Sequence, residues 1–230
     1  MPPSPMDSPG AKLFRGGRIW NGRDDDVVDA DLLVEGGVIR QIAPRIADAP
    51  TSADVIDASG ATIIPSMVEA HGHLSFPEVN YVYHVEDTPP EETAFITMHN
   101  ARRLIGAGFT GVIGAGSPWL RAEIVVRNEI DAGLIPGPRL MPSTPTITVT
   151  GGLNDTAQLH QDRRVAALVC DGPEEIRKAV RLCYREGVEV VKLNVSGDDY
   201  FPRPGGRVTP MAEDEVAMAC SVARELGLLV

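Results

Sequence analysis

The chain has 230 residues, of which 43% are hydrophobic and 23% charged, a composition typical of a folded protein with one large or two small domains. Its formal net charge of −11 argues against general binding to nucleic acid or to anionic membranes, because both need clustered Lys and Arg. Three cysteines without zinc spacing predict reduced thiols in a cytoplasmic protein, and no apolar run is long enough to span a membrane.

The first quarter of the sequence predicts a small β unit. Residues 1–11 have neither the basic region nor the apolar core of a signal peptide, and we expect them to be a disordered lead-in. Between residues 12 and 62, short apolar pieces alternate with glycine-containing turns, and Glu35-Gly36-Gly37-Val38 predicts a hairpin. We therefore expect residues 12–62 to fold as a small all-β unit.

From residue 63 onward the pattern predicts alternating strands and helices. Proline followed by Glu marks helix starts and Gly marks helix ends. Because loops after strands are longer than loops after helices, the pattern favours a (β/α) barrel with its site at the C-terminal ends of the strands. We expect strands at 63–70, 109–113, 138–142, 188–195 and from 228, and helices at 89–106, 119–132, 173–187 and 211–227, with a long polar loop at 143–164.

Two histidines stand at the end of the first of these strands. Strand side chains alternate between faces, so Glu69, His71 and His73 should share one face. Two imidazoles on one face can hold a metal ion. The alternative is a pair of surface histidines beside a turn.

A lysine lies on the polar end of the strand expected at 188–195. Val188, Val190, Lys192 and Asn194 share one face of that strand. A lysine inside a barrel is costly unless it is paired or neutral. Either Lys192 extends to the rim of the barrel, or its amine is carboxylated by carbon dioxide and becomes an anion that can bridge two cations.

These motifs together resemble the N-terminal half of a metal-dependent amidohydrolase, in the branch of the Xaa-Pro dipeptidases and imidazolonepropionase. The resemblance covers residues 12–230. It implies the first half of a TIM-type (β/α)8 barrel at 63–230, preceded by a small all-β unit of the composite sandwich type. The matching segments are Ile56-Asp57-Ala58-Ser59-Gly60, His71-Gly72-His73, Gly106-Ala107-Gly108-Phe109-Thr110, Gly137-Pro138-Arg139, Thr150-Gly151-Gly152 and Val191-Lys192.

The resemblance implies hydrolysis of an amide-like C–N bond, in a peptide, urea, carbamate or lactam, at a site with two divalent metal ions. His71 and His73 would ligate the more buried metal, and Lys192, as a carbamate, would bridge both. Zinc is the default metal, with cobalt, manganese or iron as alternatives. Two further histidines and the aspartate that shuttles the proton would come from strands beyond Val230, so we expect no catalytic residue in this chain.

Three residues are candidates for contact with a small-molecule substrate: His84, Leu153 and Tyr200. His84 could approach the site from a loop, and Leu153 stands where the family often has a histidine. The family's Asp and Arg-Asp are likewise replaced, by Glu69 and by Ile113-Gly114, so we expect a substrate pocket unlike that of the dipeptidases. The loop at 198–203 either faces substrate or is solvated, and we favour the solvated loop.

Two other classes of function remain open. A half-barrel leaves unpaired sheet edges, so the chain could assemble as a non-catalytic binding or structural protein. For an enzyme, the same edges predict a homo-oligomer or a complementing C-terminal half. Alternatively, Gly114-Ala115-Gly116 between a strand and a helix could bind a nucleotide, but Trp119 stands where the fingerprint needs a third glycine, which favours a simple tight turn.

Overall fold

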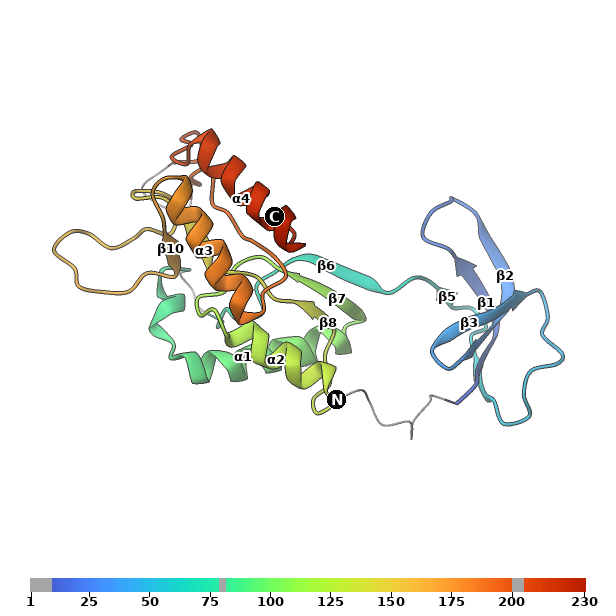
Figure 1. Cartoon of the computed structure of the whole chain (residues 1–230). Coiled ribbons are helices and arrows are strands. Elements are labelled where there is room, and N and C mark those ends of the chain that lie inside the picture. Colours follow the sequence, from blue (N-terminus) through green and yellow to red (C-terminus); the bar gives the residue numbers. More distant parts are fainter. Residues whose placement is uncertain (1–9, 79–81, 200–204) are drawn as a thin grey trace. The chain divides into compact units, whose positions relative to one another are not determined.

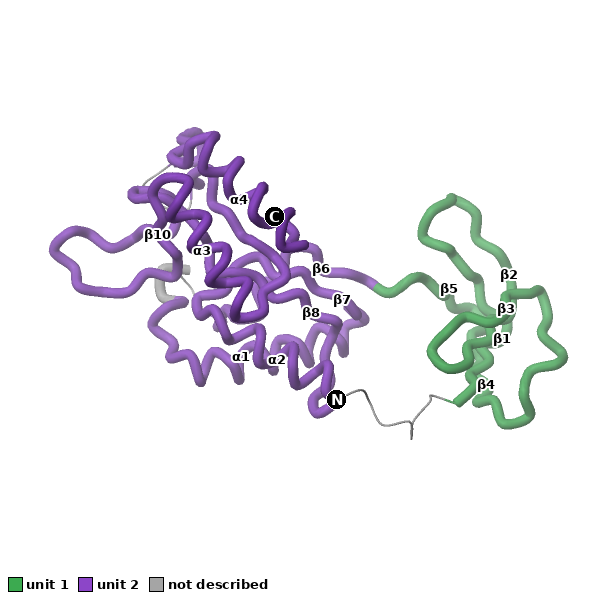
Figure 2. Tube along the Cα trace, viewed as in Figure 1, with its two compact units in different colours: residues 1–66 green, residues 67–230 purple. Residues whose placement is uncertain are grey.

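The computed structural model describes residues 10–78, 82–199 and 205–230, and only the backbone of residues 82–84. The chain divides into two compact units, Met1–Ser66 and Met67–Val230 (Figures 1 and 2). No helix among the described residues is long and apolar enough to cross a membrane.

The first unit is a single sheet in which β1 pairs with β2, β4 and β5. The β1–β2 and β2–β3 pairs are antiparallel, whereas β4 and β5 run parallel to β1. Leu13, Leu33 and Ile46 form one small core, and the buried Asp31 carboxylate accepts hydrogen bonds from the backbone amides of Gly16 and Ile46, which lower its pKa. The strands are β1 (Lys12–Trp20), β2 (Val27–Glu35), β3 (Val38–Ala43), β4 (Asp54–Asp57) and β5 (Thr62–Ile63).

The second unit is built on parallel strands. Strands β6 (Met67–Gly72), β7 (Phe109–Gly114) and β8 (Arg139–Met141) form one sheet in that order. Single parallel bridges then connect Ser143 to Val190 and Val190 to Leu229. Thus the segment at 188–195, which we expected to be a regular strand, is held by isolated bridges in the position that a strand would occupy.

Among the described residues of this unit, four α-helices accompany the strands. They are α1 (Pro90–Gly106), α2 (Ala122–Asp131), α3 (Pro173–Glu186) and α4 (Glu213–Leu226), and a short 3₁₀ helix, η1 (Val82–Asp87), precedes α1. Proline in the first turn and glutamates beside it favour the starts of α1 and α3. Gly187, with φ of 102°, ends α3 in a left-handed conformation that other residues adopt only with strain.

The helices pack in two pairs, α1 with α2 and α3 with α4 (Figure 1). The α1–α2 pair covers a core that contains Leu74, Val112 and Leu140. The α3–α4 pair covers the largest core, which contains Ile147 and Ile176. Parallel strands combined with helices confirm the expected mixed α/β fold, and closure into a barrel stays a prediction.

Two local features of the second unit differ from those expected from sequence. The strand expected at 63–70 is interrupted between β5 and β6, where Pro65 lacks the amide needed for a ladder hydrogen bond. The polar loop expected at 143–164 contains β9 (Thr146–Thr148), which pairs in parallel with β10 (Ala167–Val169). Three-residue strands carry too little alternation to be recognised from sequence.

Candidate metal and substrate site

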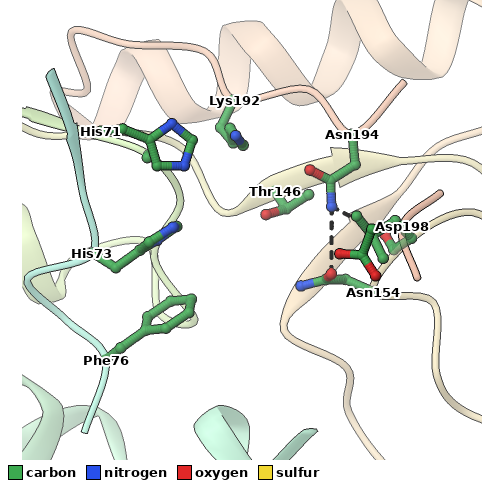
Figure 3. Close-up of a pocket in the computed structure, with 10 residues that line it drawn as sticks. His71, His73, Phe76, Thr146, Asn154, Lys192, Asn194 and Asp198 are labelled. Atoms are coloured by element: carbon green, nitrogen blue, oxygen red, sulfur yellow. Dashed lines mark hydrogen bonds between the residues drawn. The ribbon is translucent and has the colours of Figure 1, made fainter. Parts of the chain in front are cut away.

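A pocket of about 280 Å³ opens at the carboxyl ends of β6 and β7 (Figure 3). The picture shows His71, His73 and Phe76 on one side of it and Asn154, Asn194 and Asp198 on the other. The pocket is lined by His71, His73, Phe76, Ala115, Thr146, Leu153, Asn154, Lys192, Asn194 and Asp198.

The two histidines lie close together at the end of β6. Their ring centroids are 5.1 Å apart with an angle of 76° between the planes, and Phe76 stacks on His73 at 4.4 Å. Pairing between β6 and β7 shifts register between Glu69 and Gly72. The Glu69 carboxylate accepts a hydrogen bond from the backbone amide of His71 at 2.9 Å, and this bond stabilises the backbone between the two histidines and the strand.

The orientation of His73 favours one tautomer. Its Nδ1 lies 3.4 Å from the carbonyl oxygen of Gly116, which can only accept a hydrogen bond. Nδ1 must therefore carry the proton, and Nε2 is the nitrogen that remains available to a ligand. His73 keeps exposed surface, but desolvation by the protein on its buried side lowers its pKa, which favours the neutral imidazole that a metal requires.

Lys192 reaches the same pocket from the segment at 188–195. Its backbone amide donates to Thr144 Oγ1 at 2.9 Å and its carbonyl accepts from the amide of Ile147 at 2.8 Å. Val191, beside it, is buried in the core on the other side of the segment. Desolvation lowers the pKa of the Lys192 amine, so burial favours its neutral form.

The opposite wall is polar and comes from two loops. The amide nitrogen of Asn194 donates to the carbonyl of Leu153 at 3.3 Å and to Oδ1 of Asn154 at 3.4 Å. Asn154 has φ of 73°, a conformation that Asn adopts more readily than most residues. The alternation at 188–195 marked Asn194, whereas Asn154, Thr146 and Phe76 were missed. Asp198, expected from sequence to lie in a solvated loop, lines the pocket.

The loop that carries Leu153 and Asn154 is anchored at both ends. At its start, Thr150 donates a backbone and a side-chain hydrogen bond to Asp171, at 2.9 and 2.6 Å. At its end, the guanidinium of Arg164 stacks on Trp119 at 3.7 Å and donates to the carbonyl of Pro118 at 2.6 Å. These anchors hold the polar wall against the rest of the pocket.

Two of the substrate candidates lie wholly or partly outside the described residues. The backbone of His84 lies in η1, but its side chain falls outside the described part of the chain, as does the whole of Tyr200. Leu153 lines the pocket.

Within residues 10–78, 82–199 and 205–230, no three His, Cys, Asp or Glu side chains cluster closely enough to hold a metal ion. The donors that fit a metal here are thus two imidazoles, with Lys192 as a third after carboxylation.

The turn at Gly114-Ala115-Gly116 is packed beside this site. The amide of Gly116 donates to Ser143 Oγ at 2.8 Å and its carbonyl faces His73. A Cβ on Gly114 would stand 2.6 Å from Oε2 of Glu123. These contacts favour the interpretation as a tight turn and argue against a phosphate-binding loop, because the Gly116 amide already donates to Ser143.

Behind the turn, the carboxyl group of Glu123 is fully buried in the first turn of α2. It accepts hydrogen bonds from Ser75 Oγ and the amide of Ser143, both at 3.1 Å. Desolvation outweighs these bonds and raises the pKa of Glu123 to about 7.

The raised pKa predicts a pH-dependent stability. The folded chain binds this proton more tightly than the unfolded chain, so the stabilisation is complete below pH 4.5 and is lost as pH rises toward 7. Over that interval the unfolding free energy of the native chain should fall by about 3 kcal/mol relative to that of Glu123→Gln. Urea unfolding of both proteins at a series of pH values measures this difference. If the unfolding free energies of the two proteins changed with pH in parallel, the raised pKa of Glu123 would be contradicted.

Comparison with known proteins identifies the family. The model of the amidohydrolase family matches residues 62–230. The chain belongs to the amidohydrolase family. This confirms the resemblance inferred from the sequence motifs.

Curated relatives of this amidohydrolase include dihydroorotases. The dihydroorotase of Mycobacterium tuberculosis is 28% identical over 222 residues, which cover 87% of this chain and 49% of the relative. A Staphylococcus aureus dihydroorotase is 36% identical over 75 residues, or 33% of this chain and 17% of the relative. The chain spans about half or less of the length of these relatives.

Solved structures of amidohydrolases and prolidases match nearly the whole chain. An amidohydrolase structure is 27% identical with a TM-score of 0.82, and the match covers 95% of this chain and 55% of that one. A prolidase complexed with N-methylphosphonate-L-proline is 24% identical with a TM-score of 0.83, covering 95% and 54%. At that identity the prolidase shows the shared fold alone.

Proposed function

We propose that this amidohydrolase chain contributes His71, His73 and Lys192 to a binuclear metal centre that hydrolyses an amide-like C–N bond of a small molecule. The observation that carries the proposal is the convergence of these three side chains on one pocket at the carboxyl ends of parallel strands. Substrate sites of (β/α) barrels lie at this end of the strands. Zinc as the metal and a cytoplasmic location belong to the same proposal.

The residues present fit part of a metal shell. Two imidazoles at this separation would suit a divalent ion such as zinc, and Lys192 would supply ligand oxygens only as a carbamate. Bound divalent ions would supply Lewis acidity toward a substrate carbonyl and a water of lowered pKa. The protein's own part is to fix the backbone at His71, whose amide donates to Glu69, and to orient the imidazole of His73 through the carbonyl of Gly116.

Carboxylation of Lys192 starts from the neutral amine. A bond forms between Nζ and the carbon of carbon dioxide as one C–O π bond opens, and one proton passes from the nitrogen to solvent. The product carries two oxygen donors and one negative charge in place of a positive ammonium. Exchange of a cation for an anion favours two nearby divalent ions and removes the cost of a half-buried ammonium group.

The polar wall gives the proposed substrate its orientation. Asn194 and Asn154 present amide groups to the pocket, and the Leu153 side chain replaces the polar group that the family often has there. We propose Leu153, with His84 and Tyr200, as substrate contacts. The pocket then recognises the non-reacting part of an amide-like substrate, in a peptide, urea, carbamate or lactam, by a mixed polar and apolar surface.

We also propose that residues 63–230 form half of a (β/α)8 barrel. Support comes from the parallel order of β6, β7, β8 and the bridged segments, and from matched relatives about twice as long as this chain. The other half, with the catalytic aspartate, would come from further residues of a longer chain, a second copy or a complementing chain.

Replacing the lysine tests the bridging role. Lys192→Ala should lower the bound metal per chain, and short carboxylic acids such as formate or acetate should restore part of it by taking the place of the carbamate. Metal content by plasma mass spectrometry, with and without the acid, measures both effects. Lys178→Ala is the matched control, because Lys178 is exposed on α3. Unchanged metal in Lys192→Ala would refute the bridging role.

A further inference from the structure

Glu123 accepts hydrogen bonds from the segments that follow two strands, β6 and β8, and it lies outside the pocket. It lies in the first turn of α2, and its side chain is fully buried. Its Oε1 accepts from Ser75, two residues after His73, and its Oε2 accepts from the amide of Ser143, two residues after β8. A buried carboxyl group with no solvent contact is costly, so it needs such partners to be retained.

The same carboxyl group is connected to His73 by hydrogen bonds on the two sides of Gly116. Ser143 Oγ approaches Glu123 Oε2 at 3.5 Å and accepts from the amide of Gly116 at 2.8 Å. The carbonyl of Gly116 then faces Nδ1 of His73 at 3.4 Å. The path therefore runs from Glu123 through Ser143 Oγ to the amide of Gly116, and then across the backbone of Gly116 to its carbonyl and the imidazole.

The space around this chain is filled, so its members have little freedom to move. A Cβ on Gly114 would stand 2.6 Å from Glu123 Oε2 and 2.9 Å from the amide nitrogen of Ser143. Gly116 has φ of 119°, and a Cβ there would stand 3.0 Å from Oγ1 of Thr146. Only glycine allows the turn to approach the carboxyl group and the histidine together.

We propose that Glu123 is a positioning residue that fixes the Nδ1–H tautomer and the orientation of His73 through Ser143 and Gly116. This inference rests on the proposed function in one respect, which is that Nε2 of His73 is taken as the nitrogen that binds a metal. Partners of this kind orient metal-binding histidines and raise metal affinity without touching the metal.

The tautomer of His73 tests this directly in the metal-free chain. Long-range ¹H–¹⁵N NMR correlations of labelled histidine, at about pH 8, distinguish Nδ1–H from Nε2–H imidazole. Native protein should show Nδ1–H for His73. Glu123→Ala and Ser143→Ala should both raise the Nε2–H fraction, whereas Glu123→Gln should retain Nδ1–H, because its amide can accept from Ser143 and donate to Ser75.

Glu215 provides the matched control. It is a buried glutamate in α4 of the same unit whose carboxylate accepts from the amides of Gly172 and Ala212, at 2.6 and 2.7 Å. Glu215→Ala should leave the His73 tautomer unchanged. An equal shift in Glu215→Ala, or retained Nδ1–H in folded Glu123→Ala and Ser143→Ala, would overturn the proposal. If Glu123→Ala does not fold, Ser143→Ala alone decides, because it removes only one hydroxyl group.

Titration with Co²⁺ separates this inference from the proposed function. Glu123→Ala should bind Co²⁺ about 10- to 100-fold more weakly than native chain, with Glu123→Gln and Glu215→Ala close to native. Equal affinity of native chain and Glu123→Ala would overturn the positioning role. A native chain that shows the Nδ1–H tautomer but binds no Co²⁺ would refute the metal site and leave the tautomer result to decide the role of Glu123.

Discussion

The double variant His71→Ala, His73→Ala should bind Zn²⁺ or Co²⁺ at least about 100-fold more weakly than the native chain. Loss of one partner that merely orients a ligand costs about 10- to 100-fold in metal affinity, so loss of two direct ligands should cost more. Both rings line the same pocket with their centroids 5.1 Å apart. Calorimetric titration of the metal-free proteins measures the change.

Two other histidines provide the control for this variant. His99 on α1 and His160 in a loop are both exposed and outside the pocket. The double variant His99→Ala, His160→Ala should bind metal as the native chain does. Equal affinity of the two double variants would mean that metal binds elsewhere, and would contradict the site.

Ile147→Ala should destabilise the second unit by about 2–5 kcal/mol. Ile147 is fully buried in the core under α3 and α4, and its loss removes apolar contacts and leaves a cavity. Urea unfolding followed by circular dichroism measures this cost. The backbone of Ile147 is bonded to Lys192 O and to the amide of Asn194, at 2.8 and 2.9 Å, and the variant keeps both bonds.

Leu159→Ala is the control for the core substitution. Leu159 is fully exposed in the polar loop, and its truncation should change the unfolding free energy by less than about 0.5 kcal/mol. If both variants lost the same small amount, the core that supports the Lys192 segment would not be packed as described.

The features that could be predicted from sequence are those encoded by neighbouring residues. Proline and glutamate marked the starts of α1 and α3, and Gly187 marked the end of α3. The alternation of residue types along 188–195 predicted that Lys192 and Asn194 share one face, and both line the pocket. His71 and His73 were found in the same way, because two histidines separated by one residue stand out at the end of an apolar strand.

What could not be predicted depends on contacts between distant segments. The pairing of β9 with β10 joins two three-residue pieces, each too short to show a period. Asn154 reaches the pocket because a loop anchored at Asp171 and Trp119 brings it there. Glu123 resembled an ordinary charged residue of a first helical turn. Its burial against Ser75 and Ser143 follows only from the three-dimensional packing of α2 against the segments after β6 and β8.

Metal content per chain is the most direct test of the central claim, measured by plasma mass spectrometry on the 230-residue protein purified without chelator or tag. A site formed by His71, His73 and Lys192 predicts about one or more tightly held transition-metal ions per chain. A folded sample without metal, which also takes up none from added Zn²⁺, would contradict the claim that these three residues form a metal-binding site.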